Sequence, residues 1–548
     1  MKATKIIILL YIGILVSSCK KYEEVPNELV NPDIIYDQFD KNGTYAQWVR
    51  NDLYTYLPDG FNRIDNVVLD AATDDAVASR YGSPIELLAK SGITAGTNPD
   101  DRWATSYAAV RKVNIFLSKI DVVPYDAASI KFWKAEARFI RAMNYFELLK
   151  RYGGVPLLGD QVFGLNDNLS NIPRNTFDEG VQYILAECEA IKPLLRTEPV
   201  LDTFLGSITR GAAYALKSRV LLYVASPLNN PANDQNKWLA AANAAKDLIN
   251  LNVYSLTPAF TSAFLNRKNS EVILAYQKAQ NRTLETGNAP IGFAEPNASN
   301  GYVNPSQNLV DAFPMSDGRA IDATAATLPY KAQDPYANRD PRLGLTVFYN
   351  GASWLSRAVE TFDGGLDRPG GMRLQTRTGY YMRKFLGLFG TATAYQDQTH
   401  NFPIFRYAEI LLNYAEAINE TGNQAEALTQ LKLIRNRAGI PLGNVVGYAH
   451  GIRTDLNQVE MRKVIQNERR IEMAFEEQRF WDIRRWKIAE QVGNSSVRGM
   501  QIVKQGSTFT YTPIVVDQLS FVAPKMYLYA IPLKEIVADP ALQQNPGY

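Results

Sequence analysis

Asp74 and Asp75 are neighbouring carboxylates, a residue type that can supply a general acid and a general base. In a glycosidase, two such groups must face one bond across roughly 5–9 Å. Two adjacent residues in a loop rarely face one bond from opposite sides. Hydrogen bonds to the hydroxyl groups of a ligand, or capping of the loop itself, therefore fit this pair better than catalysis does.

Aromatic side chains could supply a second kind of contact, stacking on a ligand ring. Trp103 begins a predicted helix, and its indole could cover the C–H face of a sugar ring without any charge. Packing in the core is an equal alternative, because Trp is mostly buried in proteins. The opposite wall should come from one or two aromatics of a long irregular segment that contains Phe293, Tyr302, Trp354 and Tyr395. Tyr302 and Trp354 are the first choices.

Short motifs for other chemistries are missing from the sequence. There is no His-Glu-x-x-His, no Gly-x-Ser-x-Gly and no Walker-type phosphate loop. The chain has only two histidines and two cysteines, which argues against His-based metal sites, and no Cys/His metal spacing is present. We therefore expect no enzyme, no metal and no cofactor. A glycosidase stays open as an alternative, because two carboxylates leave no short signature.

The overall charge gives no reason to expect a polyanionic partner. The 548 residues carry a net charge of +2 and are 46% hydrophobic, as in an ordinary globular protein with a sizeable core. Nucleic acid and anionic lipid are therefore not expected as partners. The 30 Tyr, 23 Phe and 7 Trp residues are compatible with a surface for stacking ligands.

The N-terminus predicts export and anchoring. Lys2 and Lys5 precede an apolar run from Ile6 to Val16, which has the length of a signal peptide and is too short to span a bilayer. The ending Leu15-Val16-Ser17-Ser18-Cys19 resembles a bacterial lipobox. We expect residues 1–18 to be cleaved, Cys19 to carry lipid, and residues 19–34 to tether the protein to the exterior of the outer membrane.

Helical periodicity dominates two blocks, about 103–250 and 405–490. Thr176 and Glu179 form a capping-box pattern, and Gly153 follows a helix. In the second block the apolar and small residues have the spacing of a tetratricopeptide repeat: Leu411, Ala415, Ile418, Gly422, Ala427, Leu431 and Ile434. Cys188 is expected to be buried in a helix.

Between the two blocks, residues 255–402 are rich in Gly, Pro, Asn and Asp. Strands are expected at Glu271–Gln277, Leu345–Asn350, Tyr380–Phe385, Tyr511–Val516 and Met526–Ile531. The predicted fold is mainly α, with a tetratricopeptide-like scaffold of helical hairpins, long irregular insertions and short β-hairpins. We expect one domain over residues 35–548, with its ligand-binding insertion at about 255–402.

A charged segment from Glu468 to Trp486 is expected to form one helix. Its carboxylates and guanidinium groups could suggest catalysis. Because buried charges persist only when they are paired, we expect ion pairs that hold this helix against its neighbours. Arg339-Asp340-Pro341-Arg342 is expected to be a structured turn.

Several segments resemble, in order along the chain, those of the SusD/RagB lipoproteins, the substrate-binding partners of TonB-dependent transporters. They are Phe139–Phe146 with Tyr152–Leu157, Ala215–Tyr223, Asn308–Phe313 with Asp317-Gly318, Asn338–Arg342, Ala415–Ala417, Glu468–Glu472 with Arg479–Asp482 and Arg485-Trp486, and Gln544–Tyr548. The similarity covers nearly the whole chain.

This resemblance implies a lipid-anchored protein that captures oligosaccharide and delivers it to a SusC-like, TonB-dependent outer-membrane barrel transporter. It also implies that the segment with Asp74, Asp75, Arg80, Tyr81 and Trp103 borders the ligand. Three alternatives remain. The same role could serve a peptide ligand, the protein could be a surface glycosidase, or the helical repeats could bind only protein.

Overall fold

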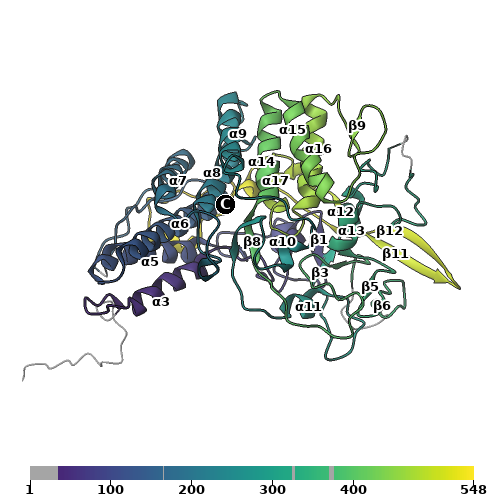
Figure 1. The fold of residues 1–548 in the computed structure, drawn as a ribbon, viewed down its shortest axis with the longest axis horizontal. Coiled ribbons are helices and arrows are strands. Elements are labelled where there is room, and N and C mark those ends of the chain that lie inside the picture. Colours follow the sequence, from purple (N-terminus) through teal and green to yellow (C-terminus); the bar gives the residue numbers. More distant parts are fainter. Residues whose placement is uncertain (1–34, 165, 324–327, 369–375) are drawn as a thin grey trace, which may run out of the picture.

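The computed structural model describes residues 35–548 except for 165, 324–327 and 369–375. The predicted signal peptide, tether and lipid anchor at Cys19 lie outside the described residues. Long helices gather in one part of the molecule, and irregular chain with short strands forms the rest (Figure 1). The predicted fold class is confirmed.

The long helices pack mainly on their neighbours in sequence. They are α3 (Thr44–Leu53), α5 (Trp103–Lys119), α6 (Ala127–Tyr152), α7 (Phe177–Ile191), α8 (Arg210–Ala225), α9 (Gln235–Ile249), α14 (Tyr407–Glu420), α15 (Gln424–Arg437) and α16 (Gln458–Glu472). Contacts run from α5 through α6, α7 and α8 to α9, and α9 packs on α14. The two predicted helical blocks therefore join into one stack, although the long insertion separates them in sequence. Within the described residues, no helix has the length and apolar character needed to cross a membrane.

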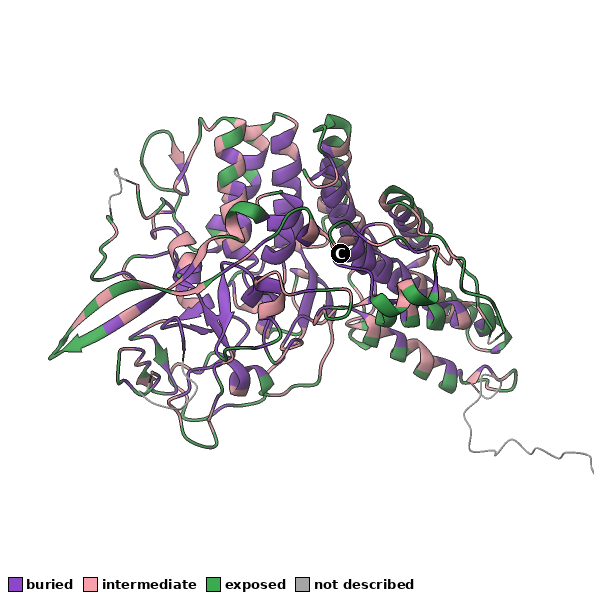
Figure 2. Cartoon of the chain, turned by 180° about the vertical axis from the view of Figure 1, so that it is seen from behind, coloured by how far each residue is buried: buried purple, intermediate pink, exposed green. Residues whose placement is uncertain are grey.

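Shorter helices are distributed along the rest of the chain. They are α4 (Glu86–Ala89), α10 (Ser262–Leu265), α11 (Thr283–Asn288), α12 (Gln307–Ala312), α13 (Pro341–Thr346), α17 (Arg479–Arg485), α18 (Ala489–Val492) and α19 (Leu533–Ala538). Buried residues run through both the helical part and the insertion (Figure 2), so the two share a continuous interior.

The strands pair two by two, always antiparallel. The pairs are β1 (Ala76–Ala78) with β3 (Val303–Pro305), β2 (Val272–Tyr276) with β8 (Phe402–Arg406), β4 (Val347–Phe348) with β7 (Tyr381–Met382), β5 (Ser353–Trp354) with β6 (Arg357–Ala358), β9 (Tyr448–Ala449) with β10 (Ile452–Arg453), and β11 (Ser496–Gln505) with β12 (Thr508–Gln518). The β11–β12 hairpin projects from the body (Figure 1).

Local signals in the sequence fix several helix ends. The Thr176 side chain accepts from the N–H of Glu179 at 3.2 Å, and the Glu179 carboxylate accepts from the N–H of Thr176 at 2.7 Å. This reciprocal pair confirms the predicted capping box. Gly153 follows α6 with φ of 73°, a conformation that favours glycine. Cys188 is buried in α7, as predicted.

Three of the predicted strands are wrong in whole or in part. Lys525–Tyr527 forms a 3₁₀ turn, and the Met526–Ile531 segment belongs to no strand. The N–H of Tyr529 in this segment donates to the carbonyl of Arg151 at the end of α6, at 2.6 Å. Most of Leu345–Asn350 and most of Tyr380–Phe385 are likewise not strand, since only Val347–Phe348 and Tyr381–Met382 pair with each other. Alternating apolar residues in a sequence do not show whether a second strand lies beside the segment to pair with it.

The predicted single helix from Glu468 to Trp486 is also wrong, because the chain breaks between α16 and α17. Phe475 and Glu477 adopt left-handed backbone angles, with φ of 63° and 57°. The N–H of Phe475 leaves the helical pattern and donates to the Asp70 carboxylate at 2.9 Å. Contacts with a distant segment therefore override the local helical preference.

The predicted ion pairs are present at this break. Glu472 lies fully in the core and contacts Arg342 of α13, Arg406 of β8 and Arg437 of α15. Burial alone would raise the pKa of Glu472, but these three guanidinium groups outweigh it and hold that pKa well below its usual value. Glu472 thereby joins four elements through charge-assisted hydrogen bonds.

Replacing Glu472 by Gln should lower the free energy of unfolding by about 3–5 kcal/mol, because an amide leaves buried guanidinium groups without their counter-charge. Urea unfolding measures this loss. Glu189→Gln is the matched control, since the Glu189 side chain is 49% exposed where it pairs with Lys192 and Lys217. That variant should lose less than about 1 kcal/mol. A loss at Glu472 as small as the control's would contradict the role given to the buried pairs.

Candidate functional site

Asp74 and Asp75 lie inside the protein and are bound by arginines. Arg479 and Arg470 contact Asp74 at 2.9 and 2.8 Å, and Arg470 also contacts Asp75 at 2.5 Å. Burial raises the pKa of both carboxyls. At Asp74 the two arginines outweigh burial and lower the pKa to about 2, whereas the pKa of Asp75 stays raised. The expectation that these carboxylates contact a ligand is corrected: they hold the 70–75 segment to α16 and α17.

The pairing of β1 with β3 brings Arg80 and Tyr81 beside Tyr302. Ala78 lies opposite Val303, and the N–H of Ser79 donates to the carbonyl of Tyr302 at 2.9 Å. The chain leaves β1 directly into Arg80 and Tyr81, while Tyr302 directly precedes β3. Three of the predicted site residues, distant in sequence, therefore meet at one end of a two-stranded sheet.

Tyr81 presents an open aromatic face. Its side chain is 71% exposed, and the guanidinium carbon of Arg377 lies 3.9 Å from the ring centroid. Arg377 is itself buried and fixed by the carbonyl of Ala78 at 3.1 Å and by Asp517 at 2.8 Å. One face of the Tyr81 ring thus rests on a rigid cation and the other is free to stack on a ligand.

Polar side chains surround the two tyrosines. Arg80 pairs with Asp65, which also accepts from the Ser83 hydroxyl at 2.7 Å. Asn62 and the Tyr302 ring both lie next to Gly287. A Cβ at Gly287 would be 3.3 Å from the Asn62 amide nitrogen and 3.6 Å from the Tyr302 ring. The N–H of Asn300 donates to the carbonyl of Thr286 at 2.9 Å. We call this group the tyrosine surface: Arg80, Tyr81 and Tyr302 with Asn62, Asp65, Thr286 and Asn300.

The structure does not bring Trp354 to this surface. Trp354 is fully buried, its indole N–H donates to the Tyr395 hydroxyl at 3.1 Å, and its ring packs on Phe348 and Phe389. Its predicted contact with ligand is corrected, because the ring completes the core of the insertion.

Trp103 is also a packing residue. It is 4% exposed and packs against Tyr107 and Tyr152. Its edge borders a mainly apolar hollow of about 540 Å³ that is also lined by Phe163 and Leu542. That hollow shares no residue with the tyrosine surface. The burial of Trp103 therefore supports the core alternative over stacking.

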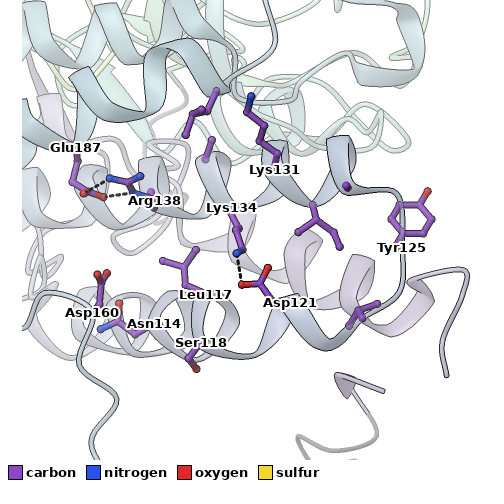
Figure 3. Close-up of a pocket in the computed structure, with 15 residues that line it drawn as sticks. Asn114, Leu117, Ser118, Asp121, Tyr125, Lys131, Lys134, Arg138, Asp160 and Glu187 are labelled. Atoms are coloured by element: carbon purple, nitrogen blue, oxygen red, sulfur yellow. Dashed lines mark hydrogen bonds and ion pairs between the residues drawn. The ribbon is translucent and has the colours of Figure 1, made fainter. Parts of the chain in front are cut away.

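A larger hollow of about 880 Å³ lies along α5, α6 and α7 (Figure 3). Most of its charged side chains are already paired: Arg138 binds Glu187 through two bonds of 3.1 and 2.8 Å, and Lys134 binds Asp121 at 2.5 Å. The ring of Tyr125 at one end stacks on Trp133. This hollow offers no open aromatic face comparable to Tyr81.

Sequence reasoning missed the polar partners of the tyrosine surface. Asn62, Thr286 and Asn300 are ordinary loop or helix residues, and no local pattern marks them. Arg377 escaped notice because its role depends on its position under Tyr81. Among the described residues, no group of three His, Cys, Asp or Glu side chains is placed to bind a metal.

Comparison with known proteins identifies the family. The family model described as "SusD family" matches residues 270–548, half of the chain. The chain belongs to the SusD family. A second model, described as "Starch-binding associating with outer membrane", matches residues 51–222 of this SusD family protein.

Individual relatives extend over most of the chain. A SusD-like protein P2 of Formosa agariphila is 25% identical over 81% of this SusD family member and 80% of its own length. The crystal structure of a SusD-like protein from Bacteroides fragilis is 28% identical, with a TM-score of 0.77, over 93% of this chain and 98% of that one. A SusD-like carbohydrate-binding protein from the same species is 23% identical with a TM-score of 0.75, over 92% and 100%, and shows the shared fold.

Proposed function

We propose that this protein captures an oligosaccharide at the tyrosine surface. The exposed Tyr81 ring, backed by Arg377, carries the proposal. A sugar ring presents C–H groups on one face, and these pack on an open aromatic face without needing charge. The amide and hydroxyl groups of Asn62, Thr286 and Asn300 can donate to and accept from sugar hydroxyls at the ring edge. The starch-binding description of the second family model supports this choice of ligand.

We further propose that the protein binds without catalysis. A glycosidase needs two facing carboxylates, and the pair that the sequence offered, Asp74 and Asp75, is held in the interior by Arg470 and Arg479. The bound oligosaccharide would pass unchanged to a TonB-dependent, SusC-like barrel transporter. Membership of the SusD family supports this delivery step.

Tyr81→Ala should weaken oligosaccharide binding by about 5- to 150-fold, the equivalent of about 1–3 kcal/mol for a lost stacking contact. Its melting temperature should change little, because the ring is mostly outside the core. Titration calorimetry with soluble starch and laminarin, followed by an array of other oligosaccharides, provides the affinities.

Trp48→Ala is the control for this test, since Trp48 is 62% exposed on α3, away from β1 and β3 (Figure 1). It should leave the affinity unchanged. Equal affinities for wild type and Tyr81→Ala would remove the tyrosine surface from the site. New reducing ends in the wild-type sample, above those of a boiled control, would favour a glycosidase instead.

We propose that lipid on Cys19 holds the protein at the outer membrane, facing the exterior, because residues 15–19 resemble a lipobox. The second family model's description supports the outer-membrane location.

Cys19→Ala should abolish membrane association, measured by fractionation of cells that lack the transporter. It should also abolish incorporation of labelled fatty acid into the protein. Cys188→Ala, which changes the buried cysteine of α7, should keep both. Membrane association of Cys19→Ala in those cells would exclude the proposed anchor.

A further inference from the structure

From the charges around the tyrosine surface we infer that its ligand is a neutral oligosaccharide, with neither uronic acid nor sulfate groups. This inference rests on the proposed function of the tyrosine surface. Whether the cations at this surface are free to bind an anion separates a site for an acidic glycan from a site for a neutral one. A site for an acidic glycan presents guanidinium or ammonium groups that have no other counter-ion, because such groups bind carboxylate and sulfate strongly.

Arg80 is the most exposed cation of the tyrosine surface, and it already has its counter-ion. Its side chain is 55% exposed and its guanidinium is bonded to the Asp65 carboxylate. That bond lowers the pKa of Asp65, although partial burial opposes it, so Asp65 remains charged near neutral pH. An incoming carboxylate would meet attraction from Arg80 and repulsion from Asp65 at nearly the same distance.

The neighbouring cations follow the same rule. Arg282 precedes α11, one turn before Thr286, and pairs with Asp397 at 3.0 Å. Lys278 pairs with Asp59 at 2.6 Å. Among the residues that the structure describes, these cations on the segments next to the tyrosine surface are therefore each accompanied by an acid.

Arg377, under the Tyr81 ring, is no exception. It is buried and contacts Glu86 at 3.3 Å as well as Asp517 at 2.8 Å. Its guanidinium supports the Tyr81 ring from one face, and its charge is not available to an anion from solution. A set of paired donors and acceptors suits hydroxyl groups, which both donate and accept and bring no net charge.

Asp65 offers a direct test, because its removal would release Arg80. Asp65→Asn keeps the side-chain shape, and Asn tolerates the φ of 51° at this position. Calorimetry on the full chain would compare neutral malto- and laminari-oligosaccharides with an oligogalacturonate of equal length. Wild type should prefer a neutral ligand, with an affinity that is nearly the same at 50 and 500 mM NaCl.

In Asp65→Asn, the ratio of oligogalacturonate affinity to neutral affinity should rise at least about fivefold and fall again with salt. Asp52→Asn is the matched control: it frees Lys112 from a pair of 2.7 Å on the helical side of the molecule, and it should leave the ratio unchanged.

The outcomes separate the two proposals. Wild-type preference for oligogalacturonate that Tyr81→Ala abolishes would overturn the neutral ligand while keeping the site. An unchanged ratio in Asp65→Asn would overturn the role of this ion pair. Binding to neither class, here or on a broader glycan array, would overturn the proposed function itself.

Discussion

Arginines buried against carboxylates connect the helical scaffold to the irregular half of this SusD family protein. Glu472 binds Arg342, Arg406 and Arg437. The neighbouring Glu468 shares Arg342 and also binds Arg435, and Glu476 shares Arg406 and also binds Lys384. Each group would be costly to bury alone, so removing one partner affects the others. The planar guanidinium suits this role because it donates to several carboxylates at once.

The tyrosine surface depends on the same type of bond. Arg470 and Arg479 of α16 and α17 fix Asp74 and Asp75, and these residues immediately precede β1. β1 in turn sets the position of Tyr81 and, through β3, of Tyr302. The residues of the proposed site thus lie on irregular chain whose path is fixed by charges in the core. The proposed site can therefore lie on loops and still have the fixed geometry that ligand recognition requires.

The scaffold was the part most open to prediction from sequence. Long amphipathic patterns and capping residues such as Thr176 and Glu179 are local, and local rules describe them well. The break at Phe475 was not predictable, because it depends on a contact with Asp70 on a distant segment. The predicted strand at Met526–Ile531 failed for the same reason: a strand needs a partner that the sequence does not name.

The site was predicted only in part. Arg80 and Tyr81, from the segment that the family resemblance places beside a ligand, meet Tyr302, a first choice among the aromatics of the insertion. Trp103, Trp354, Asp74 and Asp75 are interior residues. Residue type alone did not separate the exposed residues from the interior ones, because the exposure of a side chain follows from tertiary packing. Asn62, Thr286, Asn300 and Arg377 become candidates only through tertiary contacts around β1 and β3, which no local pattern in the sequence shows.

Hydrogen–deuterium exchange tests the central claim most directly, with the full chain measured alone and with the neutral oligosaccharide that it binds most tightly. We predict slower exchange on binding at residues 79–83 and 283–303, which carry five of the seven residues of the tyrosine surface, and no change in α5 around Trp103. Slower exchange confined to α5 or to the hollow along α5, α6 and α7, with residues 79–83 unaffected, would contradict it.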